Sequence, residues 1–145
     1  MKRVVICAAV AAALAMPAAT AAAFMHFHGA GHNRETVNFK ARIWRGRIKR
    51  VAIGFAWKNF PVRCAEGRTK TDGSFTRSMR VRHRRFHGIG RTRTKAGWVT
   101  ARVRGRFARH PKKAHGVIRV HGDFGAQATR CETGRDRWRA HRVAA

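Results

Sequence analysis

Apolar and polar residues alternate with a period of two along most of the chain from residue 37 onward. The clearest case is the segment of residues 98–107, whose two faces differ in character. One face carries Val99, Ala101, Val103, Gly105 and Phe107, and the other carries Thr100, Arg102, Arg104 and Arg106. This period indicates a β-strand with one buried face. Residues 51–57 also alternate, but neither face is charged, which indicates the most enclosed strand of the protein.

The same pattern predicts about eight short strands. They cover residues 37–43, 48–57, 60–64, 75–85, 98–107, 116–124, 126–131 and 137–143, with a short segment at 86–93. Residues 58–59 change the parity of the apolar positions and predict a bulge, and residues 65–73 are predicted to form a polar loop. No segment has a helical period. We therefore expect an all-β fold, an antiparallel meander that forms either a small β-barrel or a β-sandwich.

The first 23 residues have the pattern of a secretory signal peptide. Lys2 and Arg3 precede an apolar run at residues 4–16, Pro17 ends it, and small residues follow. The run is too short to span a membrane. Cleavage is expected after Ala21 or Ala23, so that the mature protein is secreted or associated with the cell envelope. Residues 24–34 are predicted to be a flexible leader rich in His and Gly, and residues 35–145 a single β domain.

Three cysteines are present, and Cys7 leaves with the signal peptide. The two that remain, Cys64 and Cys131, are expected to form a disulfide in an oxidising compartment, with two free thiols as the alternative. A Gly turn and then Trp138 follow Cys131. Trp138 is predicted to pack in the core near the disulfide, and Trp57 and Trp98 are expected to share that core.

Five segments together resemble a family of small, secreted, uncharacterised β-proteins of actinobacteria. They are a V-x-F-x-A strand at Val37 to Ala41, the mid-chain Cys64, the strands at Gly97 to Phe107 and Ala114 to Val120, and a C-x-T-G-x-x-x-W-x-A motif at Cys131 to Ala140. The resemblance covers most of the mature chain. It implies a fold and a disulfide, and no activity. The Arg and His content is heavier than expected of the family.

Charge narrows the range of partners. The chain has 33 Lys and Arg residues against 6 Asp and Glu residues, a formal net charge of +27. So basic a protein attracts polyanions at physiological salt. Outside the cell the candidates are nucleic acid, anionic wall polymers, acidic polysaccharide and anionic lipid surfaces.

Two rows of arginine are the candidate binding surface: Arg80, Arg82 and Arg84 on one predicted strand, and Arg102, Arg104 and Arg106 on another. If these strands are neighbours, six guanidinium groups share one surface, and each can bind phosphate or carboxylate in a bidentate manner. A solvated charged face is the alternative. Few aromatic side chains are expected on these faces, which disfavours a stacking platform for single-stranded nucleic acid.

Histidines offer two further kinds of chemistry. If the mature chain starts at Phe24, its amine, two amide nitrogens and the imidazole of His26 make a square-planar set that suits Cu(II) or Ni(II). A ribonuclease-like hydrolase would need two histidines near a lysine as acid and base, and the spacing brings no such pair together. A structural cell-envelope protein is a third alternative.

The sequence contains no convincing catalytic constellation, so we expect a non-enzymatic protein without a cofactor. Glu132 and Asp136 are expected to pair with Arg130, Arg135 and Arg137 rather than to act as a catalytic pair of carboxylates. The favoured function is a secreted, strongly cationic β-domain that binds an extracellular polyanion, either a wall polymer, an acidic polysaccharide or a nucleic acid.

Overall fold

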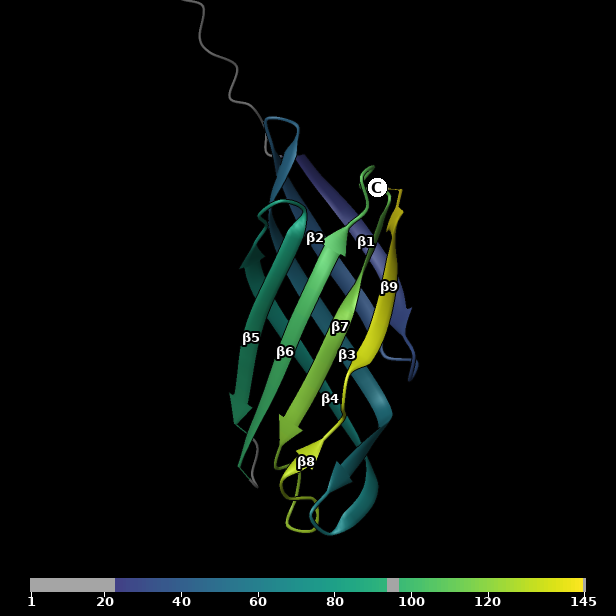
Figure 1. Cartoon of the computed structure of the whole chain (residues 1–145), viewed down its shortest axis with the longest axis vertical. Helices are drawn as coiled ribbons and strands as arrows, with labels where there is room; N and C mark the ends of the chain where they lie inside the picture. The colour runs from purple at the N-terminus through teal and green to yellow at the C-terminus, as the bar shows by residue number, and fades with distance from the viewer. Residues whose placement is uncertain (1–22, 94–96, 145) are drawn as a thin grey trace, which may run out of the picture.

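The computed structural model describes residues 23–93 and 97–144, which form β-strands joined by turns and one longer loop (Figure 1). The strands are β1 (Ala23–Gly31), β2 (Thr36–Trp44), β3 (Arg47–Cys64), β4 (Gly67–Arg80), β5 (Arg85–Arg93), β6 (Trp98–Phe107), β7 (Lys113–Gly122), β8 (Cys131–Glu132) and β9 (Asp136–Val143). The all-β prediction is confirmed. The described part of the chain contains no helix long and apolar enough to cross a membrane. The predicted signal peptide lies outside the described residues except for Ala23.

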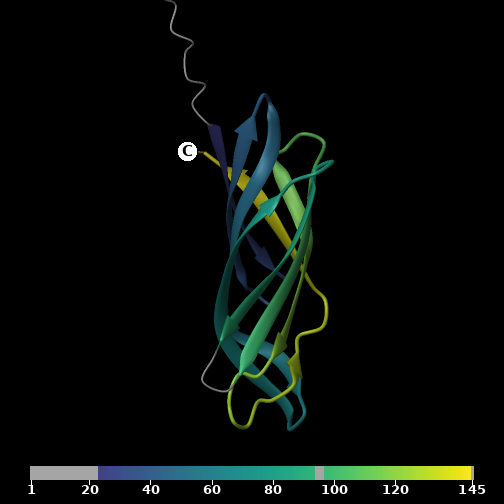
Figure 2. The same cartoon turned by 90° about the vertical axis from the view of Figure 1, so that its left-hand side faces the viewer.

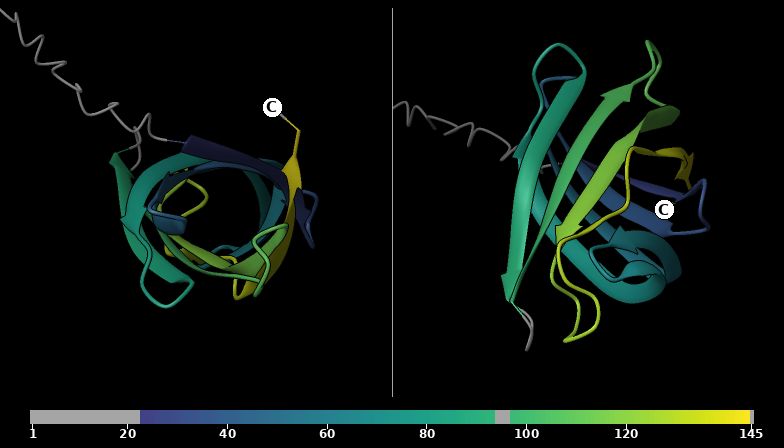
Figure 3. Two further views of the ribbon diagram at one scale, coloured as in Figure 1. Left: turned by 90° about the horizontal axis from the view of Figure 1, so that it is seen from above. Right: turned by 60° about the horizontal axis from the view of Figure 1, so that its bottom comes forward.

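The strands form one antiparallel sheet in the order β4-β3-β2-β1-β9-β7-β6-β5. The short strand β8 pairs with both β3 and β7. It thereby closes a six-stranded barrel, β3-β2-β1-β9-β7-β8, and β4, β5 and β6 are added to this ring. Seen from above, the strands surround a central axis (Figure 3). Of the two architectures that the sequence left open, the structure is the barrel.

Apolar side chains from alternating positions of the long strands fill the barrel interior. Trp138 is only 1% exposed, and its ring centroid lies 5.7 Å from that of Phe55 and 6.1 Å from those of Phe39 and Phe86. Such distances suit attractive aromatic pairs. Gly105 of β6 faces this cluster, and a Cβ there would collide with the ring of Phe86. The aromatic cluster therefore occupies the space that a ligand would need inside so small a barrel.

β4 and β5 lie side by side, but their described residues form no ladder with each other. The chain joins them through a tight turn at residues 82–85. Side chains of β4 cover the gap: Met79 lies against Gly88, and Phe75 lies so close to Gly90 that a Cβ there would collide with its ring. This β4–β5 seam is thus closed by side-chain packing instead of main-chain hydrogen bonds.

β3 is the longest strand, with 18 residues, and it bends where the bulge was predicted. Its register with β4 shifts between Trp57 and Phe60, and Asn59 has a φ of 52°. The main-chain N–H of Asn59 donates to Oδ1 of Asp72 at 2.7 Å, which holds the bend. Beyond it, the β3–β4 hairpin continues past the barrel wall to reach β8 (Figures 1 and 2).

The disulfide joins the tip of this hairpin to β8. It links Cys64 at the end of β3 with Cys131 at the start of β8, as predicted. Both cysteines are buried, with 8% and 1% of their surface exposed. We call the hairpin tip, the disulfide and β8 together the clasp, because they close the barrel ring at this end.

The predicted flexible leader at residues 24–34 is wrong. Most of it belongs to β1, which lies between β2 and β9 in the middle of the sheet. Met25 and Phe27 point into the core, and Phe27 stacks on Phe39 at 4.5 Å. The period of two is present, but histidines fill the outward positions and glycines follow. Only two of the inward positions of β1, Met25 and Phe27, carry large apolar side chains, so the alternation is too short to stand out in the sequence.

Three other boundaries also differ from the prediction. Residues 67–73 belong to β4 instead of a polar loop, and residues 85–93 form a complete strand, β5. Residues 126–130 do not form a strand; this segment holds an isolated bridge between Gly125 and Ala128 before β8 begins. In the outer part of the β3–β4 hairpin, the buried apolar residues Phe60 and Val62 are on β3, whereas on the β4 side only Thr71 is buried. Residues 67–73 therefore have no apolar face that would reveal the strand in the sequence.

Removal of the disulfide is expected to destabilise the fold. The linked residues are 67 positions apart, and closing a loop of this length in the unfolded chain corresponds to about 4 kcal/mol. The double variant Cys64→Ala/Cys131→Ala should lose roughly that free energy of unfolding in urea titrations, and the wild-type protein reduced with a phosphine should lose a similar amount. A change below about 1 kcal/mol in both would show that the clasp does not stabilise the barrel.

Candidate functional site

The outer faces of β5, β6, β7 and β9 carry a continuous group of cations, which we call the β6 cationic face. It consists of Arg85, Arg102, Arg104, Arg106, Arg119, Arg137 and Arg139, all of them exposed. β6 lies between β5 and β7, and β9 is the next strand beyond β7. The predicted row of Arg102, Arg104 and Arg106 therefore lies in the middle of this face and points away from the core.

Arginines of neighbouring strands stand directly opposite each other on this face. Arg102 of β6 is the cross-strand partner of Arg119 on β7, and Arg106 is the partner of Arg85 on β5. Neighbouring strands are about 4.8 Å apart, and like charges directly opposite each other destabilise a sheet. An anion bound across the strands would neutralise these pairs.

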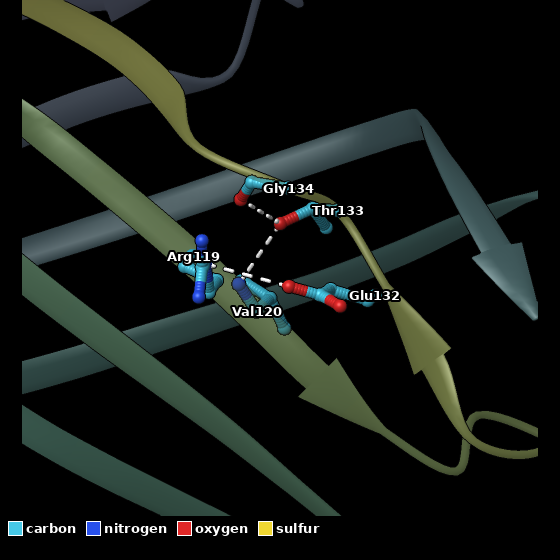
Figure 4. A network of polar contacts seen from close by, with 5 residues as sticks. All are labelled: Arg119, Val120, Glu132, Thr133 and Gly134. Carbon is cyan, nitrogen blue, oxygen red and sulfur yellow. Dashed lines mark hydrogen bonds and ion pairs between the residues drawn. The ribbon is translucent and has the colours of Figure 1, made fainter.

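Two shallow hollows follow the β6 cationic face. The first, of about 390 Å³, lies between β5, β6 and β7; its charged and ionisable border is Arg85, His87, Arg104, Arg106 and His115. The second, of about 470 Å³, lies towards β8 and is bordered by Arg102, Arg119, His121, Asp123, Arg130 and Glu132. The carboxylate of Glu132 is 3.4 Å from Nε of Arg119 there (Figure 4). The two hollows form a cationic track that ends at the clasp.

The other predicted row is not on a neighbour of β6, because β6 pairs with β5 and β7. β4 ends at Arg80, and His83 and Arg84 form the turn to β5 with φ values of 47° and 65°. Arg80 and Arg82 border another hollow of about 570 Å³ together with Arg42, Lys49 and Arg50, whereas the carbonyl of Arg84 accepts from the N–H of Phe107 at the end of β6. The condition under which six arginines would share one surface, that the two rows lie on neighbouring strands, is therefore not met.

Trp98 is not part of the core, contrary to the prediction, whereas Trp57 is buried as expected. Trp98 begins β6 with the parity of the outward residues and is 45% exposed. The guanidinium carbon of Arg91 lies 4.4 Å from its ring centroid, a cation–π contact. Trp44 is also exposed, beside Arg42 and Lys49. Aromatic surface next to cations is thus more common than the sequence indicated.

Two histidines and a lysine meet on the outer face of the sheet, where the sequence placed no such pair. His28 on β1 is opposite His141 on β9, and His141 is opposite Lys113 on β7. Nδ1 of His28 donates a hydrogen bond to Oδ1 of Asn38 at 2.6 Å. An amide oxygen can only accept, so Nδ1 is the donor, and this hydrogen bond does not use Nε2. We call these four residues the histidine cluster.

A pair of carboxyl groups is buried near the β1–β2 turn. Glu35 and Asp136 are 1% and 3% exposed, so the expected pairing of Asp136 with Arg130, Arg135 or Arg137 is wrong. Glu132 contacts an arginine, but it is Arg119 on β7 and none of these three. Burial, and then the adjacent carboxyl of Asp136, raises the pKa of Glu35 to about 8. At neutral pH Glu35 therefore carries a proton, which removes the cost of two like charges in the interior.

In the described part of the chain, the fold does not place the candidate metal ligand His26 in a group of metal-binding side chains. His26 points outward on β1, opposite Lys40 on β2 and Val143 on β9. Among the residues described, no group of three or more His, Cys, Asp and Glu side chains is placed to hold a metal ion. The amino-terminal site at His26 stays a prediction that depends on cleavage of the signal peptide.

Comparison with known proteins gives no relative: no protein-family model, no curated protein and no solved structure matches this chain. The case for function therefore depends on the chemistry of these surfaces.

The buried carboxyl pair predicts a specific dependence of stability on pH. The folded state keeps the proton of Glu35 up to about pH 8, whereas an unfolded chain releases it near pH 4.5. Between these values folding takes up a proton, so the free energy of unfolding should fall, on the order of 3 kcal/mol from pH 5 to pH 8. The variant Glu35→Gln, which stays neutral, should show a much smaller fall in urea titrations.

The exposed variant Glu132→Gln is the matched control and should keep the pH dependence of the wild-type protein. Equal pH slopes for Glu35→Gln and the wild-type protein would contradict a protonated Glu35.

Proposed function

We propose that this protein is secreted and that its β6 cationic face binds an extracellular polyanion without catalysing a reaction. The observation that carries the proposal is the direct opposition of arginines across strands, as in Arg102 with Arg119 and Arg106 with Arg85. The sheet holds like charges close together, and a bound polyanion reduces the electrostatic repulsion between them. The candidates remain a wall polymer, an acidic polysaccharide and a nucleic acid.

The spacing of the charges suits a polymer. Outward residues repeat about every 7 Å along β6, and the neighbouring strands add parallel rows about 4.8 Å away. Each guanidinium group has a planar fork of donors that matches phosphate, sulfate and carboxylate. A long anion can therefore contact several arginines at once on a surface held rigid by the ladder. Recognition of this kind depends on charge density and not on the order of monomers.

Secretion is supported by the amino-terminal pattern of Lys2 and Arg3 followed by an apolar run and small residues. The disulfide of the clasp agrees with it, because such bonds persist in oxidising compartments. An extracellular or envelope location would also bring the cationic face to the polymers proposed as ligands.

Charge reversal tests the proposal. The triple variant Arg102→Glu/Arg104→Glu/Arg106→Glu should weaken binding to immobilised heparin, duplex DNA or teichoic acid by at least about 100-fold at 0.15 M salt, and it should flatten the dependence of the dissociation constant on salt. Fluorescence anisotropy and salt-gradient elution would measure both quantities.

The control variant Arg47→Glu/Lys58→Glu/Lys70→Glu changes the net charge equally at exposed positions outside this face. If both triple variants lose the same affinity, binding is a property of net charge and the proposal of a defined face fails.

The histidine cluster favours a second candidate function, cleavage of RNA. Nε2 of His28 would take the proton of a ribose 2′-hydroxyl, whose oxygen then attacks the phosphorus. His141 would donate a proton to the departing 5′ oxygen, and Lys113 would neutralise charge on the phosphate. The cross-strand register places all three groups on neighbouring strands, with His28 oriented by Asn38.

Single substitutions test this alternative. His28→Ala and His141→Ala should each reduce cleavage of a fluorogenic RNA substrate by about 100-fold or more, and the wild-type rate should have a bell-shaped pH profile. His110→Ala, an exposed histidine in the turn after β6, should retain full activity. Equal activity in all three variants would assign the cleavage to a contaminant and remove the candidate.

A further inference from the structure

The clasp forms one wall of a polar pocket that adjoins the end of the β6 cationic face and shares Arg130 and Glu132 with its second hollow. The pocket has a volume of about 950 Å³ and lies between the β3–β4 hairpin, the β1–β2 turn and the segment around β8. Arg63, Arg68 and Arg130 line it, together with Asn33 and Thr69 among other residues. We call it the clasp pocket.

Its three arginines come from three segments of the chain. Arg63 on β3 and Arg68 on β4 are direct cross-strand partners near the tip of the hairpin. Arg130 comes from the loop that precedes β8. Arg63 and Arg68, as like charges directly opposite each other, repel, and Arg130 lines the same pocket from another segment. Three cations that line one pocket favour an anion with several charges.

The backbone that carries Arg130 is firmly fixed. Arg130 has a φ of 48°, an uncommon conformation for a residue with a side chain, and its N–H donates to Oδ1 of Asp123 at 2.8 Å. The preceding Thr129 is bound to the hairpin tip: its carbonyl accepts from the N–H of Ala65 at 3.0 Å, and its N–H and hydroxyl donate to the carboxylate of Glu66. The base of the pocket is therefore held in place before any ligand binds.

The acidic residue in the pocket wall is already engaged. Glu132 faces Arg63 across the pairing of β3 with β8, but its carboxylate lies 3.4 Å from Arg119 on β7 (Figure 4). Thr133 beside it accepts a hydrogen bond from the N–H of Val120 at 2.9 Å and donates one to the carbonyl of Gly134 at 3.0 Å. These contacts build the wall, and the pocket lining holds three arginines against the one carboxylate of Glu132.

We propose that the clasp pocket is a discrete binding site for a compact, multiply charged tetrahedral oxyanion, a phosphate or sulfate group, held by Arg63, Arg68 and Arg130. Each guanidinium fork can bind two acceptor oxygens of such a group. The site differs from the β6 cationic face in form: it is a pocket lined by few charges, whereas the face is an extended row for a polymer. The proposal does not depend on the proposed function.

Titration calorimetry with inorganic phosphate and with sulfate, at matched ionic strength, tests the site. The protein should bind phosphate or sulfate with saturation and a stoichiometry of one, and the tighter of the two anions identifies the group as a phosphate or a sulfate. The variant Arg63→Gln/Arg68→Gln, which leaves Arg130 at the border of the second hollow unchanged, should weaken that binding at least about tenfold, because hydrogen bonds to charged groups are lost. All three arginines are exposed, so glutamine at these positions should leave the fold intact.

The control Arg104→Gln/Arg106→Gln removes the same charge from the β6 cationic face and should change the affinity for the small anion less than twofold. An equal loss in both double variants, or binding that does not saturate, would overturn the proposal. Heparin affinity separates the two sites: the pocket variant should keep it, and the face variant should lose it. If the protein binds the small anion but not heparin, the proposed pocket stands and the proposed function fails. If it binds heparin but not the small anion, the pocket fails and the proposed function stands.

Discussion

The packing of aromatic rings inside the barrel is the constraint on which the rest of the structure depends. Trp138 lies among phenylalanine rings from several strands, and Gly105 provides the space that this cluster needs. Because each strand alternates, fixing the apolar residues inside also fixes every arginine of the β6 cationic face outside. The interior is thus filled by side chains that stabilise the fold, and the two proposed binding sites lie on the outer surface and in the pocket beside the clasp.

The few acidic residues are used to hold the structure, which explains why so much positive charge stays uncompensated. Glu66, Asp72 and Asp123 accept hydrogen bonds from main-chain groups at the clasp and at the bend of β3. Glu35 and Asp136 are buried together, and Glu132 contacts one arginine next to β8. None of the six is placed in the middle of β6. The cationic surfaces are therefore a result of where the acids lie as well as of how many there are.

The sequence predicted best those strands that have one face buried in the core. The alternation at residues 98–107 and the two cysteines of the clasp were enough to predict a strand, its inward face and a disulfide that the structure confirms. The sequence did not reveal the strands in which few large apolar residues alternate. One is β1, which lies between two neighbouring strands, and the other is residues 67–73 of β4, which project past the barrel. The histidine cluster and the clasp pocket depend on cross-strand register between distant segments, which a local period does not contain.

The β4–β5 seam limits the association of one copy of the protein with another through their strand edges. Edge strands that face solvent are templates for other chains and a common origin of aggregation. Here the edges of β4 and β5 face each other within one molecule without forming a ladder. The ring of Phe75 and the side chain of Met79 cover the line between them. A second copy finds no free template there, and the charge of the surface repels it. If the protein binds a polymer as proposed, many copies can therefore bind side by side along one polymer strand without aggregating through this seam.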